Sequence, residues 1–384
     1  IDGDAFELGN GVARRSGGAI EFAMFRALAD RVPTVLNVGN HEPEFYDVAD
    51  VIARIQATGV TVISNLVNRA TGRPFVPAAI HLKLGAHEVV IVGLTTDLLA
   101  QYRAAVRPTL DPTNPVVWAK QNFPSLLPSA SLGIVLSHSG LKYDRDLLPL
   151  VPDGTLFVGA HDHQRFVHRI DRTVYFQSGA WNRHLSIARL RYQSGQPVWE
   201  IEQMPIDATD PADPDLARMI GETEAKYAAA EDRVIVGHLA APLGRAEAAR
   251  FAVRAVRRAS GADAAFIGST TFGDGLPAAV SQRDLDACVR FDGFLCVGEI
   301  GGAALRTLLA AANQGPDTPF AERRDEPLVA DGPAEISAEK TYRIVTTDWG
   351  MRNRGRYFGS ESLVFVEHPE LRLKAVVTQA LNEK

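Results

Sequence analysis

The sequence predicts an α/β protein with two domains, and three observations lead to this prediction. Short apolar runs typical of strands alternate with helical patterns along the chain. The chain has 384 residues, more than one hydrophobic core usually serves. Three apolar runs in the first half end directly in polar side chains, and open α/β sheets bind ligands at such strand ends. We therefore expect a functional site at these strand ends.

The composition excludes several classes of protein. With 46% hydrophobic and 22% charged residues, the chain is ordinary for a globular protein and not largely disordered. A formal net charge of −6 argues against binding to a nucleic-acid polymer or to an anionic membrane. No apolar run approaches the roughly 18 residues that a membrane span needs. The two cysteines, Cys288 and Cys296, lie in strand-like surroundings and are expected to be buried free thiols.

The first 131 residues predict alternating helices and strands, followed by a loop. A glycine-rich loop up to Gly18 precedes a helix that Pro33 ends, and a strand over 34–38 follows. A second helix, ended by Gly59, leads into a strand over 60–64. The runs 79–84 and 87–93 flank Gly85-Ala86 and predict a hairpin. Five prolines between 101 and 131 predict a loop-rich segment that could cover the strand ends.

The rest of the chain predicts more strands, a boundary and a second α/β pattern. The apolar runs before His138 and His161 are separated by a short segment, 144–150. Antiparallel strands are then expected at 167–171, 173–177, 185–191 and 198–203. A Pro- and Asp-rich stretch at 204–215 suggests a boundary, so we predict a catalytic domain over 1–207, a linker helix over 208–232 and a second domain over 233–384. Its expected elements are helices at 245–259 and 303–313 and strands at 233–237, 264–267, 294–299 and 342–347.

The polar residues at the strand ends form the donor set of a metal site. These residues are Asp4, Asn40, His138, His161 and His163. Each motif alone has a structural explanation: a His-x-His pair can occur by chance, and the segment around Asn40 can cap a loop. Their joint occurrence after successive strands favours the metal interpretation. Carboxylate, amide and imidazole donors without a thiolate favour divalent Mn, Zn, Fe or Co.

Such a site predicts a hydrolytic reaction. A carboxylate such as Asp4 can bridge two ions, and two bridged ions can clamp a phosphoryl group while generating hydroxide from bound water. His41 follows Asn40 directly and is expected to point into the same cavity, where it could protonate a leaving oxygen.

The same motifs resemble those of a known superfamily. Gly3-Asp4 and the segments 39–42, 137–140 and 159–163 are similar to successive motifs of the calcineurin-like metallophosphatases. The second half resembles the C-terminal domain of the 5'-nucleotidase family at 262–267, 281–285, 290–292 and 299–305. The resemblance implies a four-layer α/β/β/α metallophosphatase sandwich with a smaller α/β substrate-binding domain. It also implies two divalent metal ions and hydrolysis of a phosphate ester, with nucleotides as the first candidates and nucleotide sugars or cyclic nucleotides behind them.

The resemblance assigns roles to individual residues. Asp4 would bridge both ions, and His163 would belong to the second site. Asn40, His138 and His161 would complete the first metal site. His41 would be the catalytic histidine, and the family places an aspartate three residues later to orient its ring, where this chain has Glu44. The family's first motif, an Asp-x-His, would lie ahead of Gly3-Asp4, so we expect the natural chain to begin upstream.

The second half departs from the family pattern where the family binds substrate. The family's Asn-x-Gly-Gly-x-Arg reads 268–273 here, so Gly273 replaces the arginine, and Gly355 replaces a substrate-contacting aspartate. Phe291 and Trp349 occupy the positions where the family stacks a nucleobase, a contribution of roughly 1–3 kcal/mol. Phe291 could equally belong to the core, whereas Trp349 is expected to be exposed.

Two other functions remain compatible with these motifs. One is hydrolysis of a sulfur–sulfur linkage, the reaction of a sulfur-oxidation branch on the same scaffold. The other is a non-catalytic binding protein with a vestigial metal site. The arginines Arg352, Arg354 and Arg356 could meet extra phosphates of a substrate or lie in a solvated loop. Family members are often exported, which favours a periplasmic location, and the sequence makes no prediction of oligomeric state.

Overall fold

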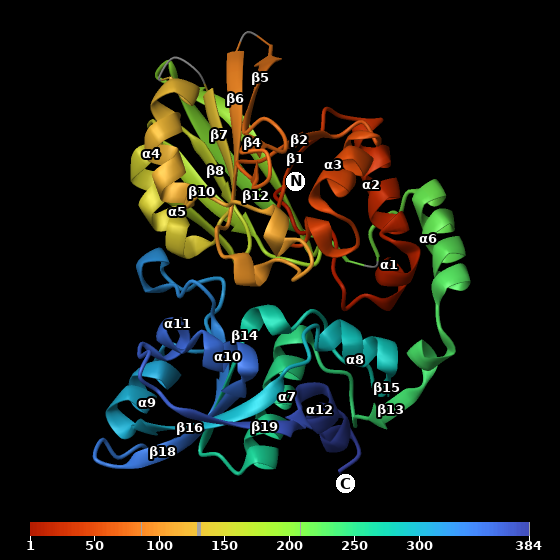
Figure 1. Cartoon of the computed structure of the whole chain (residues 1–384), viewed down its shortest axis with the longest axis vertical. Coiled ribbons are helices and arrows are strands. Elements are labelled where there is room, and N and C mark those ends of the chain that lie inside the picture. Colours follow the sequence, from red (N-terminus) through yellow and green to blue (C-terminus); the bar gives the residue numbers. More distant parts are fainter. Residues whose placement is uncertain (86, 129–131, 208, 384) are drawn as a thin grey trace. The chain divides into compact units, whose positions relative to one another are not determined.

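The computed structural model describes residues 1–85, 87–128, 132–207 and 209–383, and it divides the chain into two compact units. The first unit comprises Ile1–Leu8 and Val12–Tyr227, and the second comprises Gly9–Gly11 and Ala228–Lys384. Helices and strands alternate along both units (Figure 1). The predicted α/β fold class is confirmed. No helix among the described residues is both long and apolar enough to cross a membrane.

The first unit opens with a small helical and parallel-strand layer. Its elements are α1 (Gly11–Ser16), α2 (Ala19–Ala29), β1 (Val35–Asn37), α3 (Val48–Gln56), β2 (Thr61–Ile63), β3 (Val67–Asn68) and β4 (Arg73–Pro74). β1 and β2 pair in parallel, and an isolated parallel bridge joins Asp2 to Asn37 beside them. The apolar faces of α2 and α3 pack with Leu36 and Val62 in one buried cluster.

A six-stranded sheet forms the centre of the first unit. Its order is β5-β6-β7-β8-β10-β9, with β6, β7, β8 and β10 parallel and the outer strands antiparallel. The bounds are β5 (Ala79–Leu84), β6 (His87–Thr95), β7 (Leu132–His138), β8 (Leu156–Gly159), β9 (Arg165–Ile170) and β10 (Thr173–Ser178). Ala86, in the expected hairpin turn between β5 and β6, lies outside the described residues.

Two smaller sheets cover one face of this central sheet. Ile63 of β2 packs on Val89, Ile91 and Leu136, which joins the β1–β2 pair to β6 and β7. The hairpin of β11 (His184–Gln193) and β12 (Gln196–Pro205) packs on β8 and β10 through a second buried cluster. Helices α4 (Pro115–Leu126) and α5 (Leu141–Leu147) lie beside the sheet on its other side (Figure 1). These layers correspond to the α/β/β/α arrangement.

Two helices replace segments that the sequence predicted as loops. α1 lies in the expected glycine-rich loop, and α4 occupies twelve residues of the proline-rich segment. Pro115 is tolerated because it occupies the first helical position, where its missing N–H would have no partner in any case. The Asn114 side chain accepts hydrogen bonds from the amides of Val116 and Val117, and Pro124 falls in the last turn. The loop prediction was wrong because it ignored these positions.

The second unit is built on a five-stranded sheet of order β17-β14-β18-β16-β19. The strands of this sheet are β14 (Ala264–Gly268), β16 (Phe294–Gly301), β17 (Leu328–Asp331), β18 (Thr341–Thr347) and β19 (Phe365–Arg372). The second unit also contains β13 (Ile235–His238) and β15 (Ala279–Ser281), which pair with each other. Its helices are α7 (Arg245–Ser260), α8 (Gln282–Cys288), α9 (Gly302–Ala310), α10 (Asp348–Arg352), α11 (Arg354–Phe358) and α12 (Leu373–Leu381). Helices α7 and α12 share one buried cluster with this sheet, and α9 and α11 share another.

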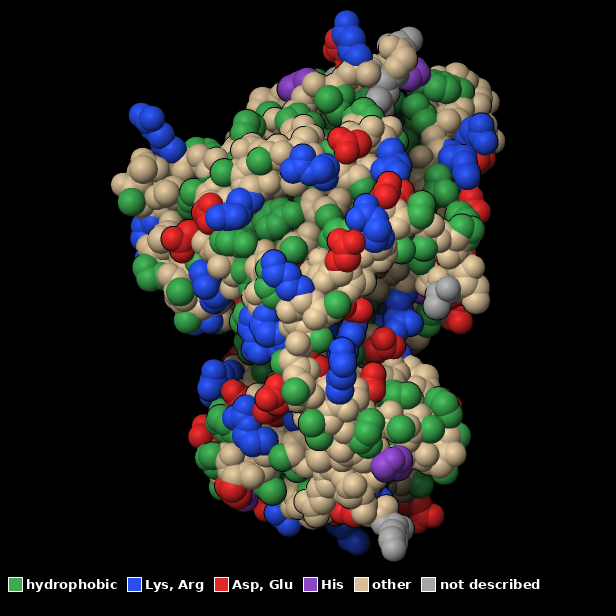
Figure 2. Space-filling model, turned by 90° about the vertical axis from the view of Figure 1, so that its right-hand side faces the viewer, with side chains coloured by type: hydrophobic (Ala, Val, Ile, Leu, Met, Phe, Trp, Pro, Cys, Tyr) green, Lys and Arg blue, Asp and Glu red, His purple; other side chains and the backbone are tan. Residues whose placement is uncertain are grey.

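One further helix belongs to the first unit, and both cysteines lie in the second. α6 (Pro214–Tyr227) packs on α2 and belongs to the first unit. Both cysteines are buried and free, as expected. Cys288 is the last residue of α8 and packs in the same buried cluster as residues of β15 and β16, whereas Cys296 lies in β16. On the face shown in Figure 2, Lys and Arg side chains are interspersed with Asp and Glu.

Candidate metal centre

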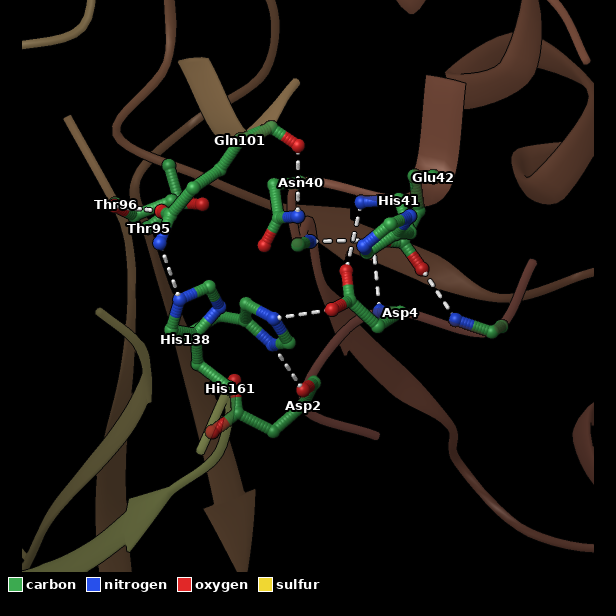
Figure 3. Close-up of polar contacts among 12 residues, drawn as sticks. Asp2, Asp4, Asn40, His41, Glu42, Thr95, Thr96, Gln101, His138 and His161 are labelled. Carbon is green, nitrogen blue, oxygen red and sulfur yellow. Dashed lines mark hydrogen bonds and ion pairs between the residues drawn. The ribbon is translucent and has the colours of Figure 1, made fainter. Parts of the chain in front are cut away.

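The ends of β1, β7 and β8 bring together the residues that the sequence singled out. His138 is the last residue of β7, and His161 follows β8 by two residues. Asp4 stands next to the bridge that joins Asp2 to β1. One ligand atom from each of Asp4, His138 and His161 lies within 4.8 Å of the others, and Figure 3 shows Asn40 beside them. The structure therefore places four of the five predicted metal ligands around one point.

Asp4 is held in an unusual backbone conformation that aims its carboxylate at this point. Its φ is +57°, in the left-handed region that few non-glycine residues adopt. Its Oδ1 accepts a hydrogen bond of 2.7 Å from the backbone amide of His41, and its Oδ2 lies 2.8 Å from Nε2 of His138. A Cβ at the preceding Gly3, whose φ is +69°, would lie 2.6 Å from the Gly39 nitrogen. Only glycine fits there.

His138 faces Asp4 through one ring nitrogen because the other is engaged. Its Nδ1 donates a hydrogen bond of 2.7 Å to the Asp2 carbonyl, which leaves Nε2 toward Asp4. Burial lowers the pKa of His138, but the adjacent Asp4 carboxylate outweighs it and raises the pKa to about 10. Burial likewise raises the pKa of Asp4, yet His138 and His41 bring it well below its usual value. A cation that displaces the His138 proton would meet a carboxylate and an imidazole lone pair.

Asn40 and His161 are both held by Gln101. The Asn40 Nδ2 donates to the Gln101 carbonyl oxygen over 3.2 Å, while its Oδ1 is buried and has no hydrogen-bond donor among the described residues. The Nε2 atoms of Gln101 and His161 are 2.9 Å apart. The ring of His161 meets that of His138 edge to face, with centroids 5.3 Å apart. An acceptor oxygen and two imidazoles therefore converge beside Asp4.

His41 and Glu44 form a charged pair next to Asp4. The His41 Nδ1 is in short hydrogen-bonding contact with a Glu44 carboxylate oxygen. Burial lowers the pKa of His41, but Asp4 and Glu44 together raise it to about 9. Glu44 is itself buried in the short helical turn Glu42–Glu44. The expected orientation of the ring by Glu44 is thus compatible with this contact.

The sequence prediction missed Glu42, although this residue shapes the loop. Its fully buried carboxylate accepts hydrogen bonds from the amides of Asp4 (3.0 Å) and Ala5 (2.8 Å), and a short one from the Gly39 amide. Burial and the nearby Asp4 charge raise its pKa. Its position next to His41 was the available signal. Three amides on one carboxylate fix the two loops against each other.

Comparisons with known proteins identify the fold. No family model matches the sequence, and no curated protein matches it. The structure resembles a 5'-nucleotidase precursor from Thermus thermophilus, with a TM-score of 0.59 and 17% identity over 94% of this chain and 84% of that one. It resembles the 5'-nucleotidase of Candida albicans with a TM-score of 0.59 and 12% identity, over 98% and 87% of the two chains. The chain has the 5'-nucleotidase fold.

A third similar structure belongs to a protein with a different activity. The sulfate thiohydrolase SoxB of Thermus thermophilus aligns with a TM-score of 0.65 and 15% identity, over 99% of this chain and 75% of that one. The predicted resemblance is therefore confirmed for the fold, and the identities stay below the level at which function follows from fold.

His163, the fifth predicted ligand, contacts Trp181. It is not among the residues whose ligand atoms lie within 4.8 Å of one another in the described part of the chain. Its ring contacts that of Trp181 edge to face, with centroids 5.1 Å apart, and its φ is +56°. Its assignment to a second metal site stays a prediction.

The two aromatic residues expected to bind a base lie in the second unit, and one of them is less exposed than expected. Phe291 is 41% exposed and does not belong to the core. Trp349 is only half-buried in α10, where it packs against the cluster around Phe266 and Tyr357. The expectation of an exposed Trp349 was wrong because its surroundings form a helix on the sheet and not a polar loop.

The arginines near Trp349 have carboxylate or carbonyl partners. Arg352 pairs with Asp348 at 3.4 Å, and Arg354 donates to the carbonyl of Glu361. Arg356 lies 3.9 Å from a carboxylate oxygen of Glu326, which is buried. These contacts give the three arginines structural roles beside any role in binding a phosphate.

Proposed function

We propose that the chain is a metal-dependent phosphoesterase of the 5'-nucleotidase type, with nucleotides as the first substrates to test. One observation carries this proposal: the ligand atoms of Asp4, His138 and His161 lie within 4.8 Å of one another at the ends of neighbouring strands. The 5'-nucleotidase fold of the chain supports it.

The residues present fit a divalent cation. A buried carboxylate, two imidazoles and an amide oxygen are typical donors for Mn²⁺, Zn²⁺, Fe²⁺ or Co²⁺. The Asn40 Oδ1 is buried without a donor in the described chain, an arrangement that is unfavourable unless a cation satisfies the oxygen. A second ion would share Asp4 and use His163.

The chemistry divides between the ions and the protein. When bound, the ions would polarise the phosphoryl oxygens and lower the pKa of a water molecule. Burial lowers the pKa of His41, but Asp4 and Glu44 raise it to about 9, and a protonated His41 can donate its proton to the leaving oxygen. Because Glu44 engages Nδ1 and holds the ring, we assign this transfer to Nε2. Phe291 and Trp349 would stack on the base of a nucleotide substrate.

A sulfur-compound hydrolase is the second candidate. SoxB has the highest TM-score among the three structures compared above, 0.65. The second unit carries Gly273 and Gly355 where the resemblance to 5'-nucleotidases implies an arginine and an aspartate. A nucleotide would lose two polar contacts at these positions, and this loss favours a smaller or different leaving group.

The proposal is tested by measuring product release from a substrate panel. Protein purified with Mn²⁺ is assayed for phosphate release from nucleoside monophosphates and other phosphate esters, and for hydrolysis of a thiosulfonate. We expect phosphate release, with kcat reduced roughly 10²–10⁴-fold in His41→Ala. The control His87→Ala removes a histidine that stacks on Tyr192 and should leave the rate unchanged. Thiosulfonate hydrolysis alone would favour the second candidate, and an unaltered rate in His41→Ala would remove His41 from the mechanism.

A further inference from the structure

Gln101 contacts two of the candidate metal ligands, and it is the first residue of the segment that the sequence predicted could cover the strand ends. Its backbone carbonyl accepts the Asn40 amide, and its side-chain Nε2 lies 2.9 Å from Nε2 of His161. Its Oε1 accepts a hydrogen bond of 2.9 Å from the Thr96 hydroxyl. Figure 3 shows Gln101 reaching from beyond the end of β6 toward both residues.

The loop that carries Gln101 is firmly braced. Tyr102 is 1% exposed, and its hydroxyl donates to the Thr96 carbonyl over 2.8 Å. Arg107 donates to the carbonyls of Tyr102 (2.8 Å) and Ala100 (2.9 Å) and thereby closes the turn from the other side. Because both neighbours of Gln101 are fixed, its side chain is held at the site and does not depend on a mobile loop.

The contact with Gln101 controls which nitrogen of His161 can bind a cation. A neutral imidazole has one protonated nitrogen and one lone pair, and the hydrogen bond at one nitrogen decides the state of the other. The Nε2 of His161 is directed at Gln101, so the contact with a cation falls to Nδ1. That role requires the proton on Nε2, donated to an acceptor oxygen.

Rotation of the Gln101 side-chain amide by 180° supplies the acceptor oxygen for the proton on Nε2 of His161. The rotation exchanges Oε1 and Nε2, so that Oε1 accepts the proton of His161 while the amide nitrogen donates to Thr96. The Thr96 hydroxyl serves either arrangement, because it can accept as well as donate. We propose that Gln101 is a positioning residue that keeps the proton of His161 on Nε2 and so presents the Nδ1 lone pair to a divalent cation.

This inference rests on the proposed metal site but not on any substrate. It is tested first by the affinity for Mn²⁺ and Zn²⁺, measured by competition with a chromogenic chelator. Gln101→Leu should lower the affinity roughly 10–100-fold, the range found for partners of metal-binding histidines. Gln101→Glu should restore it to at least the wild-type value, because a carboxylate is always an acceptor. The matched control Gln121→Leu makes the same change at an exposed position of α4 and should have no effect.

A second measurement separates this role from mere packing. In zinc-loaded protein with ¹⁵N-labelled histidines, His161 should show a metal-bound Nδ1 and a protonated Nε2, in the wild type and in Gln101→Glu. Wild-type affinity in a folded Gln101→Leu variant, or zinc on Nε2 of His161, would overturn the inference. Tight metal binding without phosphate release would contradict only the proposed function, whereas hydrolysis with unchanged affinity in Gln101→Leu would contradict only the role of Gln101.

Discussion

At the scale of single residues, hydrogen bonds fix the backbone and the carboxylate of Asp4. The backbone amides of Asp4 and Ala5 donate hydrogen bonds to the Glu42 carboxylate. The Asp4 carboxylate accepts a hydrogen bond from the His41 amide and contacts the ring of His138. The contacts with His41 and His138 restrain the Asp4 carboxylate, and those with Glu42 restrain its backbone. The functional geometry therefore depends on residues that bind no ligand themselves.

Gly39 is the residue where this close packing leaves no room for a side chain. A Cβ there would lie 2.4 Å from the Asp4 Oδ1 and 2.9 Å from the Glu42 Oε2. We predict that Gly39→Ala lowers the free energy of unfolding by about 1–3 kcal/mol and weakens metal binding, because both carboxylates must move. The measurements are urea denaturation and metal titration.

Gly221→Ala provides the matched control for that substitution. Gly221 lies inside α6 with nothing within 4 Å of its added Cβ, so alanine there should stabilise the protein by roughly 0.5–1 kcal/mol. Equal effects of the two substitutions would contradict the packing described around Gly39.

Glu44 provides a test of the protonation of His41. Because Glu44 helps to raise the His41 pKa to about 9, Glu44→Gln should lower that pKa. A reaction that needs protonated His41 is active below this pKa and lost above it. We predict that the alkaline limb of the kcat profile moves to lower pH in Glu44→Gln, measured between pH 6 and 10. An unmoved limb would show that His41 is not the titrating acid.

At the residue scale, the sequence could indicate the polar residues that directly follow strands but not those that reach the site from elsewhere. Asp4, His138 and His161 each follow an apolar run, and the structure brings them together, while their role as ligands stays a prediction. Gln101 ends a short 3-10 helix and lies six residues beyond β6, so no local pattern connects it with His161. Contacts of this kind depend on the fold.

At the element scale, helices and strands with a regular apolar pattern could be predicted from the sequence, whereas elements that depend on the exact position of a proline or on neighbouring strands could not. The strands β1, β7 and β8 and the helices α2, α3 and α7 were predicted near their observed bounds, because each has a clear apolar period. α4 was missed because its prolines were read without their positions in the helix. β17 and β19 were missed because their stability comes from neighbouring strands in the sheet.

A buried network joins three elements beneath the site. Asp144 of α5 is fully buried, and its two carboxylate oxygens accept hydrogen bonds from Ser137 of β7 (2.5 Å) and Tyr175 of β10 (2.7 Å). Burial raises the pKa of Asp144 well above 3.8, although both hydrogen bonds oppose this. Its contribution to stability is therefore complete below about pH 4 and is lost as the pH rises toward the raised pKa.

Asp144→Asn tests this network. An uncharged amide keeps the shape of the side chain without the cost of ionisation, which is about 1.4 kcal/mol for each unit of pKa shift. We predict that the free energy of unfolding falls less between pH 4.5 and 8 in Asp144→Asn than in the wild type. Urea denaturation at several pH values measures this. Parallel curves for the two proteins would contradict a raised pKa of Asp144.

At the scale of the whole molecule, each of the two units has a core of its own. The first is built on the layered sheets whose strand ends carry the candidate metal centre, and the second on a five-stranded sheet with helices on both faces. A change in composition at 204–215 indicated two domains from the sequence, while the structure divides the chain after Tyr227. The helix between these points packs on α2, a contact that no composition shift reveals.

The proposed function requires the first unit to hold a divalent cation between Asp4, His138 and His161. The most direct test is an anomalous difference map from a crystal of the protein grown with Mn²⁺, recorded where manganese scatters anomalously. We predict a peak bonded to the Asp4 carboxylate, the two imidazoles and the Asn40 oxygen, at about 2.0–2.3 Å from each donor. A saturating concentration of Mn²⁺ with no peak among these side chains would contradict it.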